Sequence, residues 1–183
     1  MSSQAIEHVV EIGPLPATID EYLVMRDRVA RTPEGGAAAF AIALVCYARD
    51  PAHGLPYVTV AIAMDLLDDD PTGYKGRRPR RAIVQNLTDR LNGPKAHIPR
   101  SYVQGTRWED GYALPAGALT VRVKQQANSV QGERAKVFVF SSGADTPRPV
   151  SLARNDKGLW KATEWSSLEV GVRAPGPRPT DDL

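Results

Sequence analysis

The residues to weigh first for chemistry are five cations that directly precede an expected helix: Lys75, Arg77, Arg78, Arg80 and Arg81. Cations at a helix N-terminus oppose the helix dipole, so local stability does not account for them. Lysine and arginine side chains bind phosphate, which makes phosphate or nucleic-acid binding one interpretation. Four acids, Asp65 and Asp68 to Asp70, lie just upstream. We expect these acids to neutralise the cluster, and phosphate binding remains the alternative.

A second candidate is the turn-rich segment 101–112, which contains Arg107, Trp108 and Tyr112. Tryptophan, tyrosine and arginine dominate the energetics of protein–protein interfaces. We therefore expect these three side chains to form a contact surface for another protein.

The third candidate is the connection 143–149, which contains Asp145 and Arg148. An Asx turn at Asp145 and an Arg148–carboxylate contact would make it a structural turn, which we favour, with a ligand contact as the alternative. If a pocket lies between helices and sheet, Asp145, Arg148, Tyr102 and His97 are its candidate residues.

Motifs for common catalytic chemistry do not occur in the chain. Cys46 is the single cysteine and lies in an apolar run, so we expect a buried thiol and neither a disulfide nor a cysteine-based zinc site. The three histidines show no metal-binding spacing, and no nucleophile elbow, phosphate loop or dinucleotide fingerprint occurs. We expect no cofactor and no metal, and a non-catalytic protein rather than an enzyme.

Composition limits the class of partner and the location. A formal net charge of +2 over 183 residues is too small for the whole domain to hold a polyanion, so nucleic-acid binding would need a local patch. We do not expect nucleic acid as a partner. The N-terminus lacks the pattern of a secretory signal and no run of 18 apolar residues occurs. We expect no membrane span and a cytoplasmic protein.

The N-terminal half reads as an arm followed by helices. Residues 1–17 form the arm, in which Val9 to Ile12 fits an edge strand. Thr18 and then Thr32 with Pro33 mark helix starts. Residues 57–67 fit either a helix or a strand, and we favour a helix. A loop is expected at 68–73, and a helix at 83–91 that ends before Asn92-Gly93-Pro94.

The C-terminal half reads as an antiparallel meander. Period-two alternation and turn residues predict strands at 119–124, 137–140, 149–153 and 159–163, with a possible fifth at 168–172. Asn155 to Gly158 is expected to be a hairpin turn, and residues 174–183 a disordered tail. The fold class is α+β, with three or four N-terminal helices packed on a C-terminal antiparallel sheet of four or five strands in a single domain, 18–173.

Several of these segments resemble an uncharacterised bacterial domain family of unknown function. The resemblance covers about 18–173, and its most specific part is Ser141-Ser-Gly-Ala-Asp-Thr-Pro-Arg-Pro149. Its other parts are 32–38, Ser101-Tyr102 with Gly105, Gly111-Tyr112, Trp160 and Trp165-Ser-Ser-Leu168. It implies a bacterial single-domain protein and assigns no catalytic residues. Leu159-Trp160-Lys161 is similar to strand endings in the cone-shaped domains related to nuclear transport factor two, although there the helices do not all precede the strands.

We therefore expect a non-catalytic protein-interaction module. The first alternative is a small-molecule-binding or enzymatic cone-like domain with a pocket between helices and sheet. The second is phosphate or nucleic-acid binding through the Lys75–Arg81 cluster.

Overall fold

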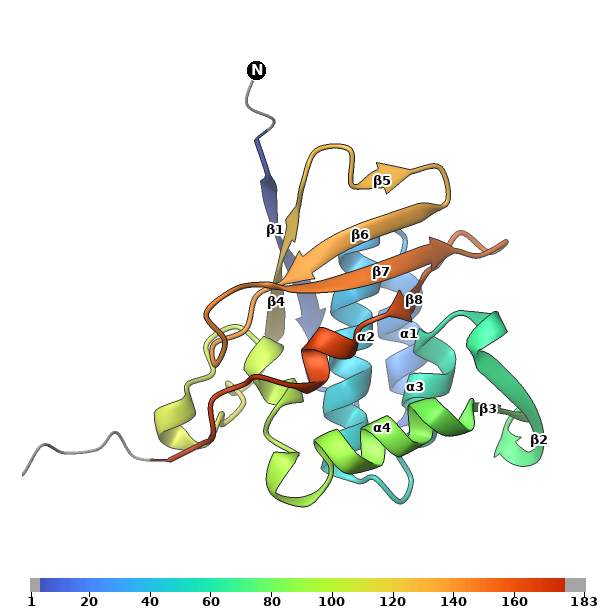
Figure 1. Ribbon diagram of the computed structural model, residues 1–183, viewed down its shortest axis with the longest axis horizontal. Coiled ribbons are helices and arrows are strands. Elements are labelled where there is room, and N and C mark those ends of the chain that lie inside the picture. The colour runs from blue at the N-terminus through green and yellow to red at the C-terminus, as the bar shows by residue number, and fades with distance from the viewer. Residues whose placement is uncertain (1–3, 177–183) are drawn as a thin grey trace, which may run out of the picture.

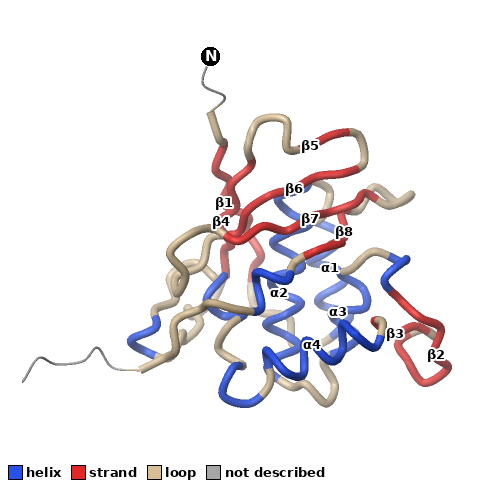
Figure 2. Tube along the Cα trace, in the orientation of Figure 1, coloured by secondary structure: helices blue, strands red, loops and turns tan. Residues whose placement is uncertain are grey.

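The computed structural model describes residues 4–176 and is an α+β fold with an antiparallel sheet (Figure 1). The strand order is β1-β4-β6-β7-β8, and a short strand, β5, pairs with β6. The strands are β1 (Ile6–Gly13), β4 (Leu119–Gln125), β5 (Val130–Gln131), β6 (Arg134–Val139), β7 (Arg148–Arg154) and β8 (Trp160–Glu164). Figure 2 shows these strands together in the upper part of the molecule and the helices behind and below them.

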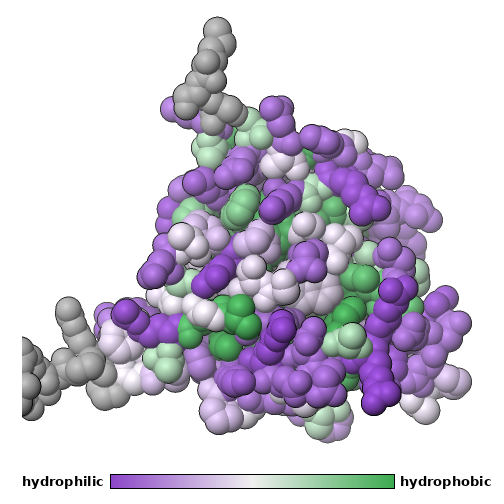
Figure 3. Space-filling model, in the orientation of Figure 1, coloured by the Kyte–Doolittle hydropathy of each residue, from purple (hydrophilic) through white to green (hydrophobic). Residues whose placement is uncertain are grey.

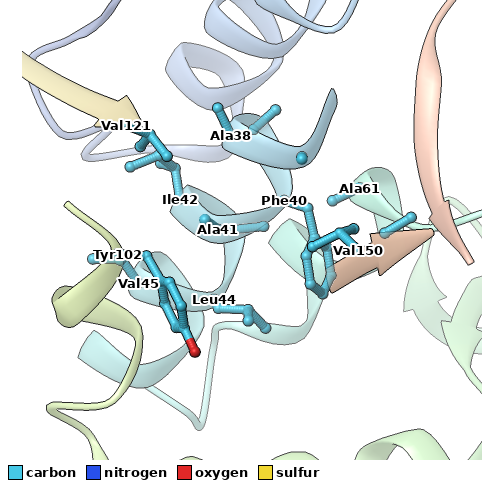
Figure 4. Close-up of a cluster of buried hydrophobic side chains, with 14 of the residues drawn as sticks. Ala38, Phe40, Ala41, Ile42, Leu44, Val45, Ala61, Tyr102, Val121 and Val150 are labelled. Carbon is cyan, nitrogen blue, oxygen red and sulfur yellow. The ribbon is translucent and has the colours of Figure 1, made fainter. Parts of the chain in front are cut away.

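Helix α2 (Pro33–Arg49) is the centre of the molecule. Thr32 accepts a 3.1 Å hydrogen bond from the Gly35 N–H, and Pro33 occupies the first helical position, as the sequence predicts. Every residue from Gly35 to Ala48 is buried. An all-round apolar helix belongs inside a core, and α2 packs on the sheet as well as on α1 (Ile19–Val29) and α3 (Leu55–Ala61). Figure 4 shows its side chains against strand residues Val121 and Val150.

Gly36 lets α2 approach β8 closely. A Cβ at Gly36 would lie 2.6 Å from the Cβ of Trp160 and 2.7 Å from its carbonyl oxygen. Any larger residue would therefore have to displace the strand backbone. Gly36 thus sets the distance between α2 and β8.

The two faces of the sheet differ because side chains alternate along each strand. One face carries buried apolar residues that pack on α2, such as Val121, Val137, Val139 and Leu152. The opposite face carries half-buried and exposed residues. We call this second face the outer face.

Several predicted elements are confirmed. Thr18 caps α1 by accepting from the Glu21 N–H, at 3.2 Å. Helix α4 (Arg81–Leu91) ends before Asn92-Gly93-Pro94. Asn155 Oδ1 accepts from two backbone N–H groups of the β7–β8 turn, and Gly158 adopts φ of 76° there. The four main predicted strands are β4, β6, β7 and β8.

Four predictions need correction. The sheet is not wholly C-terminal, because β1, from the segment predicted as an arm, forms its edge beside β4. The predicted helix 57–67 is shorter, because α3 ends at Ala61. The predicted loop 68–73 is strand β2 (Leu67–Tyr74), which pairs with β3 (Arg77–Pro79) and places aspartates of one strand opposite arginines of the other. The possible strand 168–172 is in part a 3₁₀ helix, Ser166–Glu169.

Further 3₁₀ helices connect these elements, at Met64–Leu66, Gly93–Lys95, Pro99–Tyr102 and Trp108–Asp110. Within residues 4–176, no helix has the length and apolar character needed to cross a membrane. Of the predicted tail 174–183, residues 177–183 lie outside the described residues.

Candidate functional site

The basic cluster lies on the β2–β3 hairpin and the start of α4. Three of its arginines face acids of the same hairpin: Arg77 lies 2.7 Å from Asp69, Arg78 3.5 Å from Asp70, and Arg80 3.9 Å from Asp68. Asp70 also accepts from the Thr72 N–H and hydroxyl, which with Arg78 lowers the pKa of its carboxyl. The hairpin therefore pairs most of its positive charge internally, which reduces its attraction for a polyanion.

The aromatic segment 101–112 is partly covered by the chain's own C-terminal segment. The guanidinium of Arg173 lies 4.9 Å from the centre of the Trp108 ring, and the Gly176 N–H donates to the Trp108 carbonyl. Trp108 is half-buried and Arg107 is exposed. Cation–π contact and backbone pairing thus use part of the surface on which a partner was expected to bind.

Tyr112 differs from the expectation of a surface contact, because its side chain is fully buried. Its hydroxyl donates to the Arg173 carbonyl at 2.5 Å, and the Arg173 N–H donates to Gly143 at 2.8 Å. A Cβ at Gly143 would lie 2.1 Å from the Tyr112 hydroxyl. Only glycine fits there. The segment 141–149, the most specific part of the family resemblance, therefore contains a glycine that is required for packing against Tyr112.

The hydroxyl groups of Ser141 and Ser142 also hold this part of the chain against the turn-rich segment. Ser141 Oγ donates to Ser101 Oγ at 2.8 Å, and Ser142 Oγ lies 2.8 Å from Thr106 Oγ1. The Ser142 N–H donates to the Ser101 carbonyl at 2.8 Å. These bonds attach the end of β6 to the turn-rich segment and leave no nucleophile–base pair among them.

Three of the four residues considered for a pocket are engaged in other contacts, and the fourth is exposed. Tyr102 is buried and donates to the Leu168 carbonyl at 2.9 Å, and burial raises the pKa of its hydroxyl. His97 stacks on Tyr112, its Nδ1 lies 2.9 Å from the Pro94 carbonyl, and burial lowers its pKa. Arg148 donates to the Gly171 carbonyl, and Asp145 is exposed. The space between α2 and the sheet is filled by apolar side chains (Figure 4).

A buried carboxylate, which the sequence analysis did not single out, joins the C-terminal segment to α4. Glu169 is 3% exposed, accepts from Trp165 Nε1 at 2.8 Å and lies 3.1 Å from Arg90. Burial raises the pKa of Glu169 despite both partners. No sequence pattern marks this contact, because Arg90 and Glu169 lie 79 positions apart.

Lys161 is a second perturbed group that sequence reasoning missed. Its ammonium donates to the Val60 carbonyl at the end of α3, where Arg26 also donates, at 3.0 Å. Burial, with help from the nearby Arg26 charge, lowers the pKa of Lys161 to about 8. Both cations satisfy a carbonyl near a helix C-terminus, which is a structural role. Within residues 4–176, no three His, Cys, Asp or Glu side chains are grouped to hold a metal.

The outer face of the sheet gathers aromatic and cationic side chains that the sequence analysis treated only as strand residues. Phe138 on β6 pairs across to Lys124 on β4, and the Phe140 N–H bonds to the Arg122 carbonyl. The Arg122 guanidinium lies 3.9 Å from the centre of the Phe140 ring, and the Lys136 ammonium 5.8 Å from that of Phe138. The signal was present in 136–140, where Val and Phe alternate and must face opposite sides.

Two grooves open beside the loop between β4 and β6. One has a volume of about 500 Å³ and is lined by Lys136, Phe138, Ser151 and Thr163 together with polar residues of the loop. The other, about 260 Å³, lies beside Ile6 at the start of β1 and Val130 of β5. Figure 3 shows hydrophobic residues set among hydrophilic ones in the region of β6 and β7.

The two edges of the sheet are protected to different degrees. At β8, the Ala63 N–H donates to Ala162, and the Trp160 N–H donates to Ala30. At β1, only the end is covered, by Arg28, which donates to the carbonyls of Glu11 and Ile12. Within the described residues, the backbone N–H and C=O groups of Ile6–Val10 that point away from β4 form no backbone hydrogen bond. Ile6 is 60% and Val9 56% exposed.

Comparison with known proteins gives one family. No curated protein and no solved structure matches the chain. A family model described as a domain of unknown function, DUF6935, matches residues 14–176, which includes α2, β4 to β8 and the packing contacts of Tyr112 and Gly143. The chain therefore belongs to the DUF6935 family, a domain family of unknown function.

Proposed function

We propose that the protein is a non-catalytic protein-interaction module that binds an extended segment of its partner as an added strand on β1. The observation that carries the proposal is the open edge at Ile6–Val10. Half of the backbone N–H and C=O groups of an edge strand point away from the sheet, and an extended peptide can pair with them. β1 is eight residues long and contains neither proline nor lysine, two residues that commonly protect such edges.

The side chains of β1 indicate what the added strand should carry. Val9 and Glu7 share the outer face, and Glu7 uses only Oε2 to bind Arg122. An antiparallel peptide would place an apolar residue opposite Val9 and a basic one opposite Glu7. Its next residue would lie opposite Ile6, beside the 260 Å³ groove. The expected motif, from N- to C-terminus, is apolar, any residue, basic, apolar.

Charge also argues against a second copy of the chain as the occupant. An antiparallel pair of β1 strands that aligned the two exposed Val9 residues would place Glu7 of each copy opposite Glu11 of the other. Like charges directly opposite each other destabilise a strand pair. A peptide with a basic residue avoids this repulsion.

The test is fluorescence anisotropy with a labelled peptide, Thr-Val-Thr-Lys-Val-Thr, and its counterpart with Glu in place of Lys. We expect the lysine peptide to bind roughly tenfold more tightly than the glutamate peptide. A cross-strand pair contributes about 0.2–1 kcal/mol, and the pair with Glu7 is attractive for lysine but repulsive for glutamate. Val9→Lys should weaken binding of the lysine peptide at least tenfold, and Glu7→Lys should reverse the preference. Val24→Lys, at a 73% exposed position on α1, is the matched control.

Three results would contradict the proposal. The first is equal affinity for the two peptides, and the second is unchanged affinity in Val9→Lys. The third is a dimer in light scattering that Val9→Lys converts to a monomer, because the edge would then be occupied by a second copy.

A further inference from the structure

We infer that the outer face of the sheet, centred on Phe138 of β6 and on Phe140 directly after β6, binds single-stranded nucleic acid. This inference goes beyond the proposed peptide site, because its binding groups lie on the central strands and at the 500 Å³ groove, and β1 contributes only Glu7, which orients Arg122. We call the group Arg122, Lys124, Lys136, Phe138 and Phe140 the outer-face platform.

The aromatic part of the platform has the geometry for splayed bases. Phe138 and Phe140 lie two residues apart on the same side of the chain, and so about 7 Å apart. Stacked bases in a helical strand rise about 3.4 Å each, so a duplex cannot place successive bases on both rings. A single strand with unstacked bases can do so, and aromatic side chains and arginine planes are the usual stacking partners.

Arg122 is held ready for such stacking. Its Nε and Nη2 donate to Glu7 Oε2 at 3.1 and 2.8 Å, while its guanidinium lies over the Phe140 ring. Two hydrogen bonds and a ring contact fix the plane of the guanidinium on the face of the sheet. One base can therefore stack on Arg122 above Phe140, and the next on Phe138.

The charge of the platform is only partly neutralised, because Glu7 pairs with Arg122 alone. Within residues 4–176, no carboxylate forms an ion pair with Lys124, Lys136 or the neighbouring Arg134. This distinguishes the platform from the hairpin cluster, whose arginines face three aspartates. Three unpaired cations beside two rings supply the local patch that a chain of net charge +2 needs to attract phosphates.

The groove beside Phe138 supplies groups that recognise bases. Ser151 and Thr163 hydroxyls and the amides of Gln126, Asn128 and Gln131 line it, with Arg134 and Lys136 at its side. Amides and hydroxyls both donate to and accept from base edges, and the volume of about 500 Å³ suits one nucleotide. An acidic peptide would use the cations but would gain little from the rings and amides.

The test is anisotropy with a labelled oligouridine of about 12 nucleotides and, in parallel, an RNA duplex of the same length. We expect the single strand to bind and the duplex to bind at least about fivefold more weakly. With three or four phosphate contacts, affinity should fall about 20- to 50-fold between about 50 and 200 mM salt. Phe138→Leu, which keeps an apolar side chain but removes the ring, should weaken binding at least about fivefold.

Matched variants separate this surface from the others. Lys124→Ala with Lys136→Ala should reduce the affinity and flatten its salt dependence. Arg78→Ala on the hairpin should leave stacking intact and binding within about twofold. Thermal melting of each variant checks that the fold is retained.

The inference is overturned by any of four results: no binding of the single strand at about 50 mM salt, equal binding of the duplex, unchanged binding in folded Phe138→Leu, or displacement by oligoglutamate at the same concentration as by unlabelled oligouridine. The last result would assign the platform to acidic peptides.

Discussion

Replacing Gly36 by alanine tests how closely α2 packs on β8. Alanine favours the interior of a helix by about 1 kcal/mol over glycine, so propensity alone predicts a stabilised protein. The added Cβ, however, would lie 2.6 and 2.7 Å from Trp160 Cβ and its carbonyl oxygen. Trp160 is fixed by its N–H bond to Ala30 at 2.8 Å and by pairing with Arg154. Overpacking against such a backbone costs about 3 kcal/mol, the upper end of its usual range.

The net expectation for Gly36→Ala is a loss of about 2 kcal/mol in the free energy of unfolding. For a chain of this length that corresponds to a decrease in Tm of about 4–8 °C. Calorimetry and guanidinium unfolding measure both quantities. Val24→Ala, at an exposed position of α1, raises helix propensity without a steric contact and should leave Tm unchanged or slightly higher. A higher Tm in Gly36→Ala would refute the close packing of α2 on β8.

Two further predictions concern buried ionisable groups. The pKa of Glu169 is higher in the folded protein than its usual value, so the native state holds this proton more tightly and stability should fall as pH rises through the folded pKa. Glu169→Gln should flatten this pH dependence in thermal melts, and an unchanged profile would contradict the assignment. Burial raises the pKa of the Cys46 thiol to about 12, so iodoacetamide at about pH 8 should label Cys46 only after denaturation. Rapid labelling of the native protein would show that the thiol is accessible.

Local signals in the sequence explain what could be predicted of the fold. Thr32-Pro33 starts α2, Asn92-Gly93-Pro94 ends α4, and Asn155 with Gly158 forms the turn between β7 and β8. Each of these signals affects only the neighbouring residues. Side-chain caps bind free backbone N–H groups, proline lacks an N–H donor, and glycine adopts positive φ.

The errors come from contacts between different elements of the chain. The acidic run 68–70 reads as a loop until Arg77 and Arg78 pair with it across the hairpin. Residues 168–172 alternate like a strand, but Glu169 is fixed by Trp165 and by the distant Arg90 in a 3₁₀ turn. Such pairings override local propensity and leave no local pattern.

The same distinction applies to the candidate site. Trp108 and Tyr112 have the composition of an interface, but Arg173, some 60 positions later in the chain, contacts both. Phe138 and Phe140 could have been noticed, because a strand that alternates valine and phenylalanine must place one set away from the core. Which set faces outward depends on the packing of α2, which only the structure defines.

Strand addition at β1 is tested most directly by amide hydrogen exchange of the protein with and without the lysine peptide. On binding, we expect protection to appear in the amides of residues 6–10 and to decrease in Val9→Lys, because the added strand bonds to the open edge of β1. Protection centred on Trp108 or on the β2–β3 hairpin, or none at peptide concentrations that saturate the anisotropy signal, would contradict it.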